Sequence, residues 1–377
     1  MKSRLFTPGP TPVPEHVMLR MAEPLIHHRS PEFRAVMERI NANLGYLFQT
    51  ASPVVTLTCS GTGGVEATLV SLFSPGETVI VVNGGKFGER WVHMARVFGL
   101  DAVEVLTPWG KAVDAGRVKE ALRAHPEAGG VYLTHSETST GTALDIRELA
   151  RVIRENSEAL VCVDGISSVG ALELRPDEWG VDVCVTGSQK GLMIPPGLVF
   201  IALGERARRA IGRSKMPKFY FDLGRALRSR EGSDTPWTPA VSLVLGADAS
   251  LAMIREEGIE NIWLRHERLA RGLRAGIGAL GLALFSDSPS NAVTAVRLPA
   301  GVAWTEFRTA LKAGSGVTVG GGQGEFAGKI FRIAHLGYFD ELDMITVVAA
   351  VERALAACGF AFRHGEGVSA AQKSFLV

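Results

Sequence analysis

From about residue 54 onward, the hydrophobic positions of this chain fall into short continuous runs rather than alternating ones. Seven runs are rich in β-branched residues, and they cover residues 54–58, 78–82, 102–106, 130–134, 159–163, 182–186 and 198–203. A continuous run is typical of a strand that is buried on both faces. Because stretches of helical periodicity separate most of the runs, the pattern predicts an α/β fold with a mostly parallel seven-stranded sheet covered by helices.

The helical segments change character after about Gly232. Before that point the best-marked helix is IRELARVIREN, which follows Asp145 as its N-cap. After it, the sequence predicts a long apolar helix, a charged helix, a strand, a helix, a glycine-rich turn, a strand and a last helix, at residues 241–257, 263–275, 292–298, 304–313, 314–326, 329–334 and 341–358. This order indicates a smaller α/β domain at the C-terminal end.

Three domain-level segments follow from these patterns. Residues 1–14 are rich in proline and glycine, so we expect an extended arm there. We expect a large domain over residues 15–257 and a small domain over residues 258–377. The tail 363–377 is polar and small, which favours either poor order or contact with a partner chain.

Composition and charge exclude several classes of function. Lys and Arg total 40 against 39 Asp and Glu, so the net charge of +1 gives no field that would attract nucleic acid or a membrane surface. Of the four cysteines, Cys59, Cys162 and Cys184 lie in or beside β-branched runs and are expected to be buried thiols. The sequence has no Cys/His spacing typical of a metal site, no apolar signal core and no apolar run of membrane-spanning length. We therefore expect a cytoplasmic protein without a metal.

Candidate chemistry lies where three of the predicted strands end. Ser60-Gly61-Thr62-Gly63-Gly64 follows one strand and precedes a helix, an arrangement that presents free backbone N–H groups to a phosphate. Asp164 ends a second buried run, and Lys190 follows a third in the turn Gly187-Ser188-Gln189-Lys190. Each feature alone also has a structural interpretation as a turn, a cap or a solvated lysine.

Taken together, the three features solve one chemical problem. Pyridoxal phosphate requires a cradle for its phosphate, a carboxylate at its pyridine nitrogen and an amine that attaches its aldehyde and moves a proton. The carboxyl ends of parallel strands meet at one edge of the sheet, where α/β proteins bind ligands. The sequence therefore predicts a pyridoxal phosphate site at this edge.

Motifs over nearly the whole chain support this interpretation. The sequence contains TPGPTPVP, SGTGG, NGGKFGERW, HSETSTG, VDGISSVG, GSQKGLMIPPG, TPWTPAVSL and FRIAHLG. In these segments it resembles the class V aminotransferases of the fold-type I pyridoxal phosphate enzymes, and within them the alanine–glyoxylate and serine–pyruvate or serine–glyoxylate branch.

The resemblance implies a role for each matching residue. Lys190 would form the Schiff base with the cofactor and act as the general base, and Asp164 would pair with the pyridine nitrogen. Thr138 would support the phenolic oxygen, and Phe87 would stack on the ring where close relatives often carry Trp. Core packing is the alternative role for Phe87. The phosphate would be held by Ser60, Gly61, Thr62, Gly63 and Gln189.

Further residues are implied at the substrate side and at a subunit interface. Arg332 would bind the substrate carboxylate through two parallel hydrogen bonds, although a structural salt bridge would also explain an arginine in an apolar strand. Either Thr235 or Thr238 would reach the phosphate of a neighbouring subunit. His27, His28 and Arg29, with the arm segment 7–10, would line the substrate entrance, and a simple surface role for the histidines stays open.

The resemblance implies a ping-pong transamination from a small amino acid, alanine or serine, to a small 2-oxo acid, glyoxylate or pyruvate. Alternatives are an aspartate, pyridoxamine or ureidoglycine aminotransferase and a non-enzymatic hydrogenase-associated subunit. Cysteine desulfuration is disfavoured, because Gln189 stands where such enzymes usually place a His, and Cys358 ends an apolar helix. We also expect a homodimer with shared active sites, since helix 241–257 has much apolar surface to bury.

Overall fold

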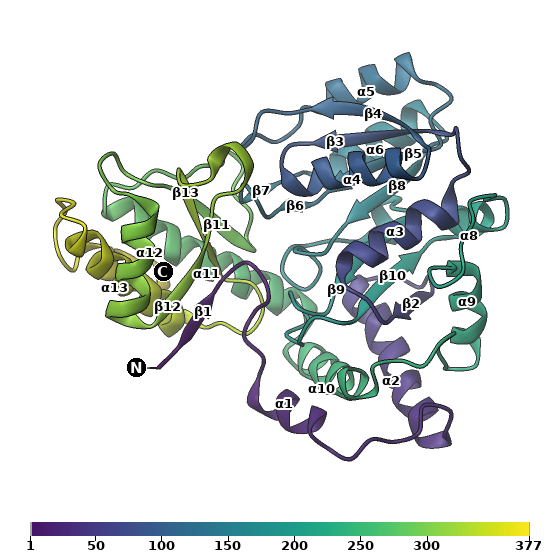
Figure 1. Ribbon diagram of the computed structural model, residues 1–377, viewed down its shortest axis with the longest axis horizontal. Helices are drawn as coiled ribbons and strands as arrows, with labels where there is room; N and C mark the ends of the chain where they lie inside the picture. The colour runs from purple at the N-terminus through teal and green to yellow at the C-terminus, as the bar shows by residue number, and fades with distance from the viewer. Residues whose placement is uncertain (1, 377) are drawn as a thin grey trace.

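The computed structural model describes residues 2–376 and forms two lobes, each built around its own sheet (Figure 1). The larger sheet has seven strands in the order β2-β10-β9-β8-β5-β3-β4. They are β2 (Val54–Leu57), β3 (Thr78–Asn83), β4 (Asp101–Leu106), β5 (Gly130–Thr134), β8 (Leu160–Asp164), β9 (Val183–Gly187) and β10 (Val199–Leu203). All seven predicted strands and the mostly parallel fold class are confirmed.

Strand direction places the chemistry of this sheet at one edge. β10 is antiparallel to both β2 and β9, whereas β9, β8, β5, β3 and β4 pair in parallel. β2 therefore runs in the same direction as β9, and every strand of this sheet except β10 ends at the same edge. The loops after β2, β5, β8 and β9, which carry the predicted site residues, all open there.

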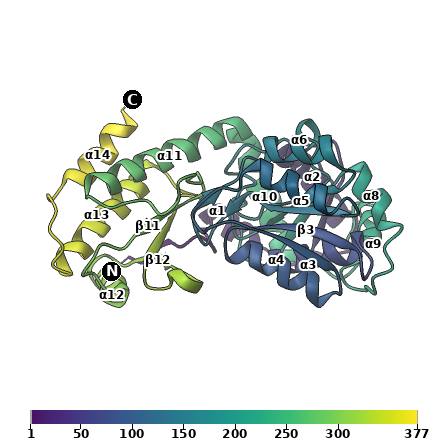
Figure 2. The ribbon, with the colours of Figure 1, turned by 90° about the horizontal axis from the view of Figure 1, so that it is seen from above.

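Helices cover both faces of the larger sheet (Figure 2). One hydrophobic cluster packs residues from α2 (Pro31–Phe48), α5 (Ala115–Ala124), α6 (Ile146–Asn156) and α10 (Val241–Glu257) against one face. The second packs α3 (Gly61–Leu72), α4 (Lys86–Val97), α8 (Glu205–Ile211) and α9 (Leu223–Glu231) against the other. Asp145 caps α6 by accepting from the Glu148 backbone N–H, as the sequence predicts. Because helices cover both faces of the sheet, a ligand can reach it only at the ends of the strands.

The smaller sheet is built from both ends of the chain. Its order is β1-β12-β13-β11, with β1 (Arg4–Phe6) parallel to β12 (Val317–Gly321), and with β13 (Ile330–Ala334) antiparallel to both β12 and β11 (Val293–Arg297). α11 (Ile259–Ala279), α12 (Trp304–Ser315), α13 (Glu341–Ala357) and α14 (Glu366–Phe375) pack on it. The extended arm is confirmed in part as a strand. The prediction of a plain turn at 314–326 is wrong, because Val317 and Val319 bury their side chains and pair with the arm.

The C-terminal tail forms the helix α14, so the expectation of poor order is wrong, whereas contact with a partner chain stays a prediction. α14 packs against α11 and α13 of the same chain, and Phe375 is 6% exposed. Its ring fills a space above Gly272, where an added Cβ would lie 2.1 Å from Phe375 Cζ. Because Gly272 has no side chain, the Phe375 ring of the tail can pack directly against its backbone.

The apolar surface of α10 is also used within the chain. Its buried residues include Val244, Leu245, Leu251 and Ile254, and the helix packs against α1 (Glu15–Met21) and α2. This packing explains the composition of 241–257 without a second subunit, so the argument for a dimer from that helix is wrong.

Shorter elements complete the fold. β6 (Ser136–Glu137) and β7 (Thr142–Ala143) form a small hairpin after β5, α7 (Pro176–Trp179) is one turn long, and η1 spans Gly324–Phe326.

Among residues 2–376, the helices are either too short or too polar to span a bilayer. The boundaries proposed for the two domains stay a prediction, although β1 attaches the arm 1–14 to the smaller sheet.

Candidate active site

Lys190 lies buried at the edge where the parallel strands end. It follows β9, is 8% exposed, and donates a hydrogen bond from Nζ to the carbonyl oxygen of Pro8. Burial lowers the pKa of Lys190 to about 8, and the charge of Arg332 acts in the same direction while that of Asp164 opposes it. An amine with this pKa is partly uncharged near neutral pH, which is the form that acts as a nucleophile.

The N-terminal arm closes over this lysine. Thr11 donates from its backbone N–H to the carbonyl oxygen of Gln189 (3.2 Å) and from Oγ1 to that of Lys190 (3.0 Å). Gly9 has a φ of +148°, and an added Cβ would lie 2.6 Å from Lys190 Nζ. Only glycine allows the backbone to pass so close to the amine. Pro8 and Gly9 of the segment 7–10 therefore lie beside Lys190. That this segment lines the substrate entrance stays a prediction.

Asp164 ends β8 and is 5% exposed. Its Oδ1 accepts from the backbone N–H of Ile166 (2.9 Å), and its Oδ2 accepts from Trp91 Nε1 (3.2 Å). Burial raises the pKa of Asp164, and these hydrogen bonds and the Lys190 charge oppose that rise. Trp91 was not found from sequence, although it stands in the segment NGGKFGERW four residues after Phe87.

The glycine-rich turn forms the N-terminus of α3 with Ser60 at the N-cap. Ser60 makes no side-chain capping bond, so the first backbone N–H groups, at Gly61, Thr62 and Gly63, stay free for an anion. A Cβ at Gly61 would lie 2.6 Å from Ile166 Cδ1, which places this helix end against the turn after Asp164.

Gln189 and Thr62 complete this part of the site. In the part of the chain that the structure describes, Gln189 Oε1 is a buried oxygen without a hydrogen-bond partner. Buried polar atoms are normally paired, so this oxygen is free to accept a hydrogen bond from a donor group. Thr62 Oγ1 accepts from Arg90 Nη1 (3.0 Å), and the Arg90 guanidinium carbon lies 5.1 Å from the centroid of the Phe87 ring.

Phe87 and Thr138 come from two further elements. Phe87 is half-buried in the first turn of α4, and it is absent from the buried residues of that helix. Thr138 lies between β6 and β7, is 3% exposed, and donates from Oγ1 to Ser167 Oγ (2.7 Å). Ser167 belongs to the turn after Asp164, so the Thr138 and Asp164 loops are joined. Ser167 stands in the motif VDGISSVG, but its contact with Thr138 was not predicted from the sequence.

Arg332 extends from β13 of the smaller sheet toward the larger one. It is 7% exposed, and it donates from Nε (2.9 Å) and Nη2 (2.8 Å) to Gly321 O and from Nη1 to Thr138 O (2.8 Å). Burial lowers the pKa of Arg332 to about 10, so it stays charged at neutral pH. No carboxylate among residues 2–376 forms a salt bridge with it, although the charge of Glu137 opposes the fall of its pKa. A buried charge without an acidic partner is suited to an anionic ligand.

The two threonines of segment 233–238 differ in their surroundings. Thr235 is 5% exposed, and its Oγ1 donates to Trp237 O (2.8 Å), whereas Thr238 is exposed. Arg29 forms an ion pair with Asp234 and donates to Thr235 O (2.8 Å). Arg29 therefore fixes this segment, while His27 and His28 pack on each other with ring centroids 4.8 Å apart.

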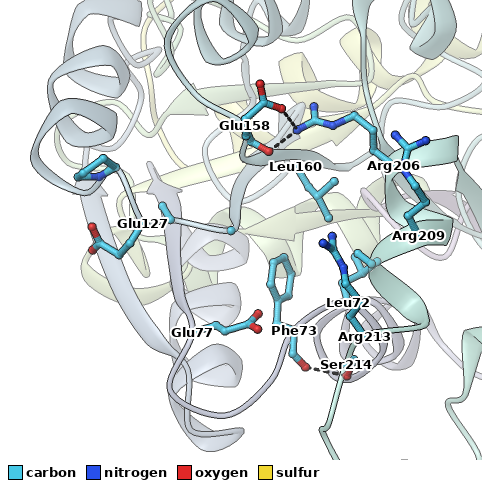
Figure 3. A pocket seen from close by; sticks show the side chains of 14 residues that line it. Leu72, Phe73, Glu77, Glu127, Glu158, Leu160, Arg206, Arg209, Arg213 and Ser214 are labelled. Atoms are coloured by element: carbon cyan, nitrogen blue, oxygen red, sulfur yellow. Dashed lines mark hydrogen bonds and ion pairs between the residues drawn. The ribbon is translucent and has the colours of Figure 1, made fainter.

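A cavity of about 660 Å³ lies apart from these residues (Figure 3). Arg206, Arg209 and Arg213 line one side of it, and Glu77 and Glu127 face them. None of the predicted site residues lines this cavity, and its charges are mixed. It is therefore not the candidate active site.

The residues at the strand ends fit pyridoxal phosphate as a set. The uncapped end of α3 suits a phosphate, and the Asp164 carboxylate suits a protonated ring nitrogen. Lys190 supplies a buried amine of lowered pKa. Within residues 2–376, no group of three His, Cys, Asp or Glu side chains has the arrangement of a metal site.

Comparison with known proteins gives matches along the whole chain. The family model for class-V aminotransferases matches residues 4–330. A soluble hydrogenase 42 kDa subunit from Anabaena cylindrica is 40% identical, with 99% of each chain covered. An L-aspartate–glyoxylate aminotransferase from Paracoccus denitrificans is 38% identical (98% of this chain, 96% of the relative), and a serine–glyoxylate aminotransferase from Methylorubrum extorquens is 34% identical (98% and 95%).

Solved structures match the fold equally fully. Ureidoglycine–glyoxylate aminotransferase from Bacillus subtilis superposes with a TM-score of 0.94 at 28% identity, covering 100% of this chain and 99% of that one. Pyridoxamine–pyruvate aminotransferase from Mesorhizobium loti gives a TM-score of 0.93 at 29% identity, covering 98% and 96%.

Proposed function

Because the chain belongs to the class V aminotransferase family, and is thus a pyridoxal phosphate-dependent transaminase, we propose that it transfers an amino group from alanine or serine to glyoxylate or pyruvate. The observation that carries this proposal is Arg332, a buried guanidinium without an acidic partner in residues 2–376 that lies close enough to Lys190 to lower the pKa of that amine. Amino acids and 2-oxo acids share the carboxylate that such a guanidinium binds.

We assign each side chain of the site one task. The bound cofactor supplies an electron sink for the carbon that loses and gains a proton. Asp164 would keep the proton on the ring nitrogen, Phe87 would pack on the ring, and the Thr138 hydroxyl would support the phenolic oxygen. The phosphate would be held by Ser60, Gly61, Thr62, Gly63 and Gln189.

Lys190 carries the proton in this proposal. Its Nζ would hold the cofactor in the resting enzyme. Once the substrate amine has displaced it, the free Lys190 amine would take the proton from the substrate α-carbon and hold it at Nζ. A pKa of about 8 makes Nζ a base and an acid of comparable strength near neutral pH. Burial by the arm segment at Pro8 and Gly9 keeps water away from this transfer.

Small substrates are favoured by the surroundings of the amine. The Gly9 backbone passes so close to Nζ that even a Cβ there would lie 2.6 Å away, so we infer that the space beside the amine is narrow. Glyoxylate, the smallest 2-oxo acid, is named in the aspartate, serine and ureidoglycine enzymes similar to this chain. The donors in those names differ, so glyoxylate is the better supported partner of the reaction.

The test is a donor and acceptor screen on the purified protein. Each amino acid is added to the cofactor-loaded enzyme, and the loss of the visible cofactor band is followed as half of the reaction. We expect alanine or serine to give the fastest loss, and glyoxylate or pyruvate to restore the band. A fast reaction with aspartate, pyridoxamine or ureidoglycine, and a slow one with alanine and serine, would contradict the proposed donors.

A second candidate function rests on the relatives named as soluble hydrogenase subunits. The same preparation distinguishes the two. If the protein transaminates alone at a normal enzymatic rate, its enzymatic role needs no hydrogenase. If turnover appears only with a hydrogenase partner present, the role as a subunit gains support.

We also propose a two-fold homodimer with shared active sites. The helix α1 and the loop after it expose Met18 (49%), Leu19 (71%) and Leu25 (72%), and Arg29 connects this region to Thr235. Thr238 is the better candidate to reach a neighbouring phosphate, because it is exposed whereas the Thr235 hydroxyl is bonded within its own loop.

To test the dimer, molecular mass and bound cofactor are measured in parallel as the protein is diluted, and both should fall together. A monomer that keeps cofactor and full activity would contradict the shared site.

A further inference from the structure

Glu137 is a buried carboxylate that the proposed mechanism leaves without a task. It ends β6, is 4% exposed, and forms no salt bridge with a basic residue within residues 2–376. Its Oε2 accepts from the backbone N–H groups of Phe87 and Gly88, both at 3.1 Å. Its Oε1 accepts from the backbone N–H (3.1 Å) and the hydroxyl (2.5 Å) of Ser139. All four partners are donors, so this side chain acts only as an acceptor.

Two of these four bonds join the Glu137 loop to a separate element, and the two from Ser139 stay within the loop. Phe87 and Gly88 belong to the first turn of α4, whose N-cap, Gly85, has no side chain to cap it. An added Cβ at Gly85 would lie 2.5 Å from Glu137 Cδ, so the glycine leaves room for the carboxylate to approach the helix end. A carboxylate there pairs free N–H groups and interacts favourably with the helix dipole. Glu137 therefore caps α4 from a distant part of the sequence.

The element that Glu137 caps carries three contacts of the site. Phe87 lies in its first turn, Arg90 donates to Thr62 in the phosphate cradle, and Trp91 donates to Asp164. Displacement of the helix end would shift all three together.

The loop at the other side of Glu137 carries the substrate side of the site. The next residue, Thr138, donates from its hydroxyl to Ser167 and accepts from Arg332 Nη1 at its carbonyl oxygen. Ser139 Oγ also accepts from the Lys86 backbone N–H (2.9 Å), so three hydrogen bonds connect the loop with α4.

We propose that Glu137 is a positioning residue, which sets the place of α4 and of the Thr138 loop relative to one another, and so aligns the cofactor contacts with the Arg332 guanidinium. This inference rests on the proposed function, because it assigns Glu137 through the residues that hold cofactor and substrate. A carboxylate is required rather than an amide, since an amide would turn an NH₂ group toward N–H donors and leave them unpaired.

The experiment compares the holoenzyme with Glu137→Gln and with the matched control Glu89→Gln. Glu89 lies on the same helix but is exposed and pairs with Lys86, so the control removes the same charge outside the site. Pyridoxal phosphate affinity is measured by titrating the cofactor-free proteins, circular dichroism reports the seating of bound cofactor, and kcat and KM are measured separately. Unfolding midpoints report stability.

We expect Glu137→Gln to bind the cofactor about tenfold more weakly and to lose about tenfold to a hundredfold in kcat/KM, because misplacement of about 1 Å costs as much. The dichroism of its bound cofactor should change, and Glu89→Gln should match the wild type in every measurement. Unchanged affinity, dichroism and kcat/KM in Glu137→Gln would overturn the inference. A lower unfolding midpoint with normal kinetics would overturn it as well, because the role would then be structural.

Two further variants keep the inference testable if Glu137→Gln does not fold. Ser139→Ala leaves the carboxylate and removes the hydroxyl that donates to it and accepts from Lys86, and Glu137→Asp keeps the charge on a shorter side chain. Both should weaken cofactor binding severalfold, and normal binding in both would overturn the inference. The wild type tests the proposed function separately: without a cofactor spectrum or transaminase turnover in the wild type, that proposal fails, whereas an active wild type with a normal Glu137→Gln refutes only the role of Glu137.

Discussion

Replacement of Arg332 by Lys separates the geometry of the proposed carboxylate clamp from its charge. A guanidinium has five N–H groups. Three of them donate to Gly321 O and Thr138 O, which leaves two for a substrate carboxylate. A lysine has three N–H groups, so after keeping bonds to the same two carbonyl oxygens it has one left for the substrate.

The expected loss is one charge-assisted hydrogen bond to the substrate, worth about 1.5–3 kcal/mol. At about 1.4 kcal/mol for each factor of ten, Arg332→Lys should lower kcat/KM for an amino acid about tenfold to a hundredfold. A matched amine that has no carboxylate does not use the clamp. Its reaction rate with the cofactor-loaded enzyme should therefore be little changed.

The assay measures single-turnover rates against concentration for alanine and for ethylamine, in wild type and variant. Arg274→Lys is the matched control, because Arg274 also has a pKa lowered to about 10 by burial and donates to Asn291 Oδ1 (3.2 Å) and Ser290 O outside the site. The control should lose stability without changing the ratio of the two rates. An unchanged alanine rate in Arg332→Lys, or equal losses for alanine and ethylamine, would refute the clamp.

Three other predictions concern separate parts of the chain. Asp164→Ala should retain part of its cofactor yet lose several orders of magnitude in turnover, and near-normal turnover would remove Asp164 from its role. In the cofactor-free protein, the pKa of Lys190 is about 8 when folded against 10.5 as the ordinary value, so the unfolded state binds more protons between these pH values. Stability relative to Lys190→Met should therefore rise with pH across that window, by up to about 3 kcal/mol, and a flat difference in denaturant titrations would contradict the lowered pKa. Phe375→Ala should cost about 3 kcal/mol of stability with unchanged kcat/KM, and an unaltered unfolding midpoint would mean that α14 is not held by this ring.

Much of the fold was readable from local sequence. The seven strands of the larger sheet were found because each is a continuous apolar run, and burial on both faces leaves that pattern in neighbouring residues. The same logic placed Asp164 and Lys190 at strand ends, where a polar residue interrupts an apolar run. The strand β12 was missed because its glycines resemble a turn, and its partner β1 lies about three hundred residues earlier.

The sequence by itself determined which residues could hold a pyridoxal phosphate cofactor, because motif and strand order are local properties. Only the tertiary structure decided which other groups support them: the Trp91 indole on Asp164, the Pro8 carbonyl on Lys190, and the Glu137 carboxylate between α4 and its neighbouring loop. It also decided that α14 folds onto its own chain and that Arg332 lacks an acidic partner within residues 2–376. These facts depend on distances between residues far apart in sequence, which close packing sets and no local pattern records.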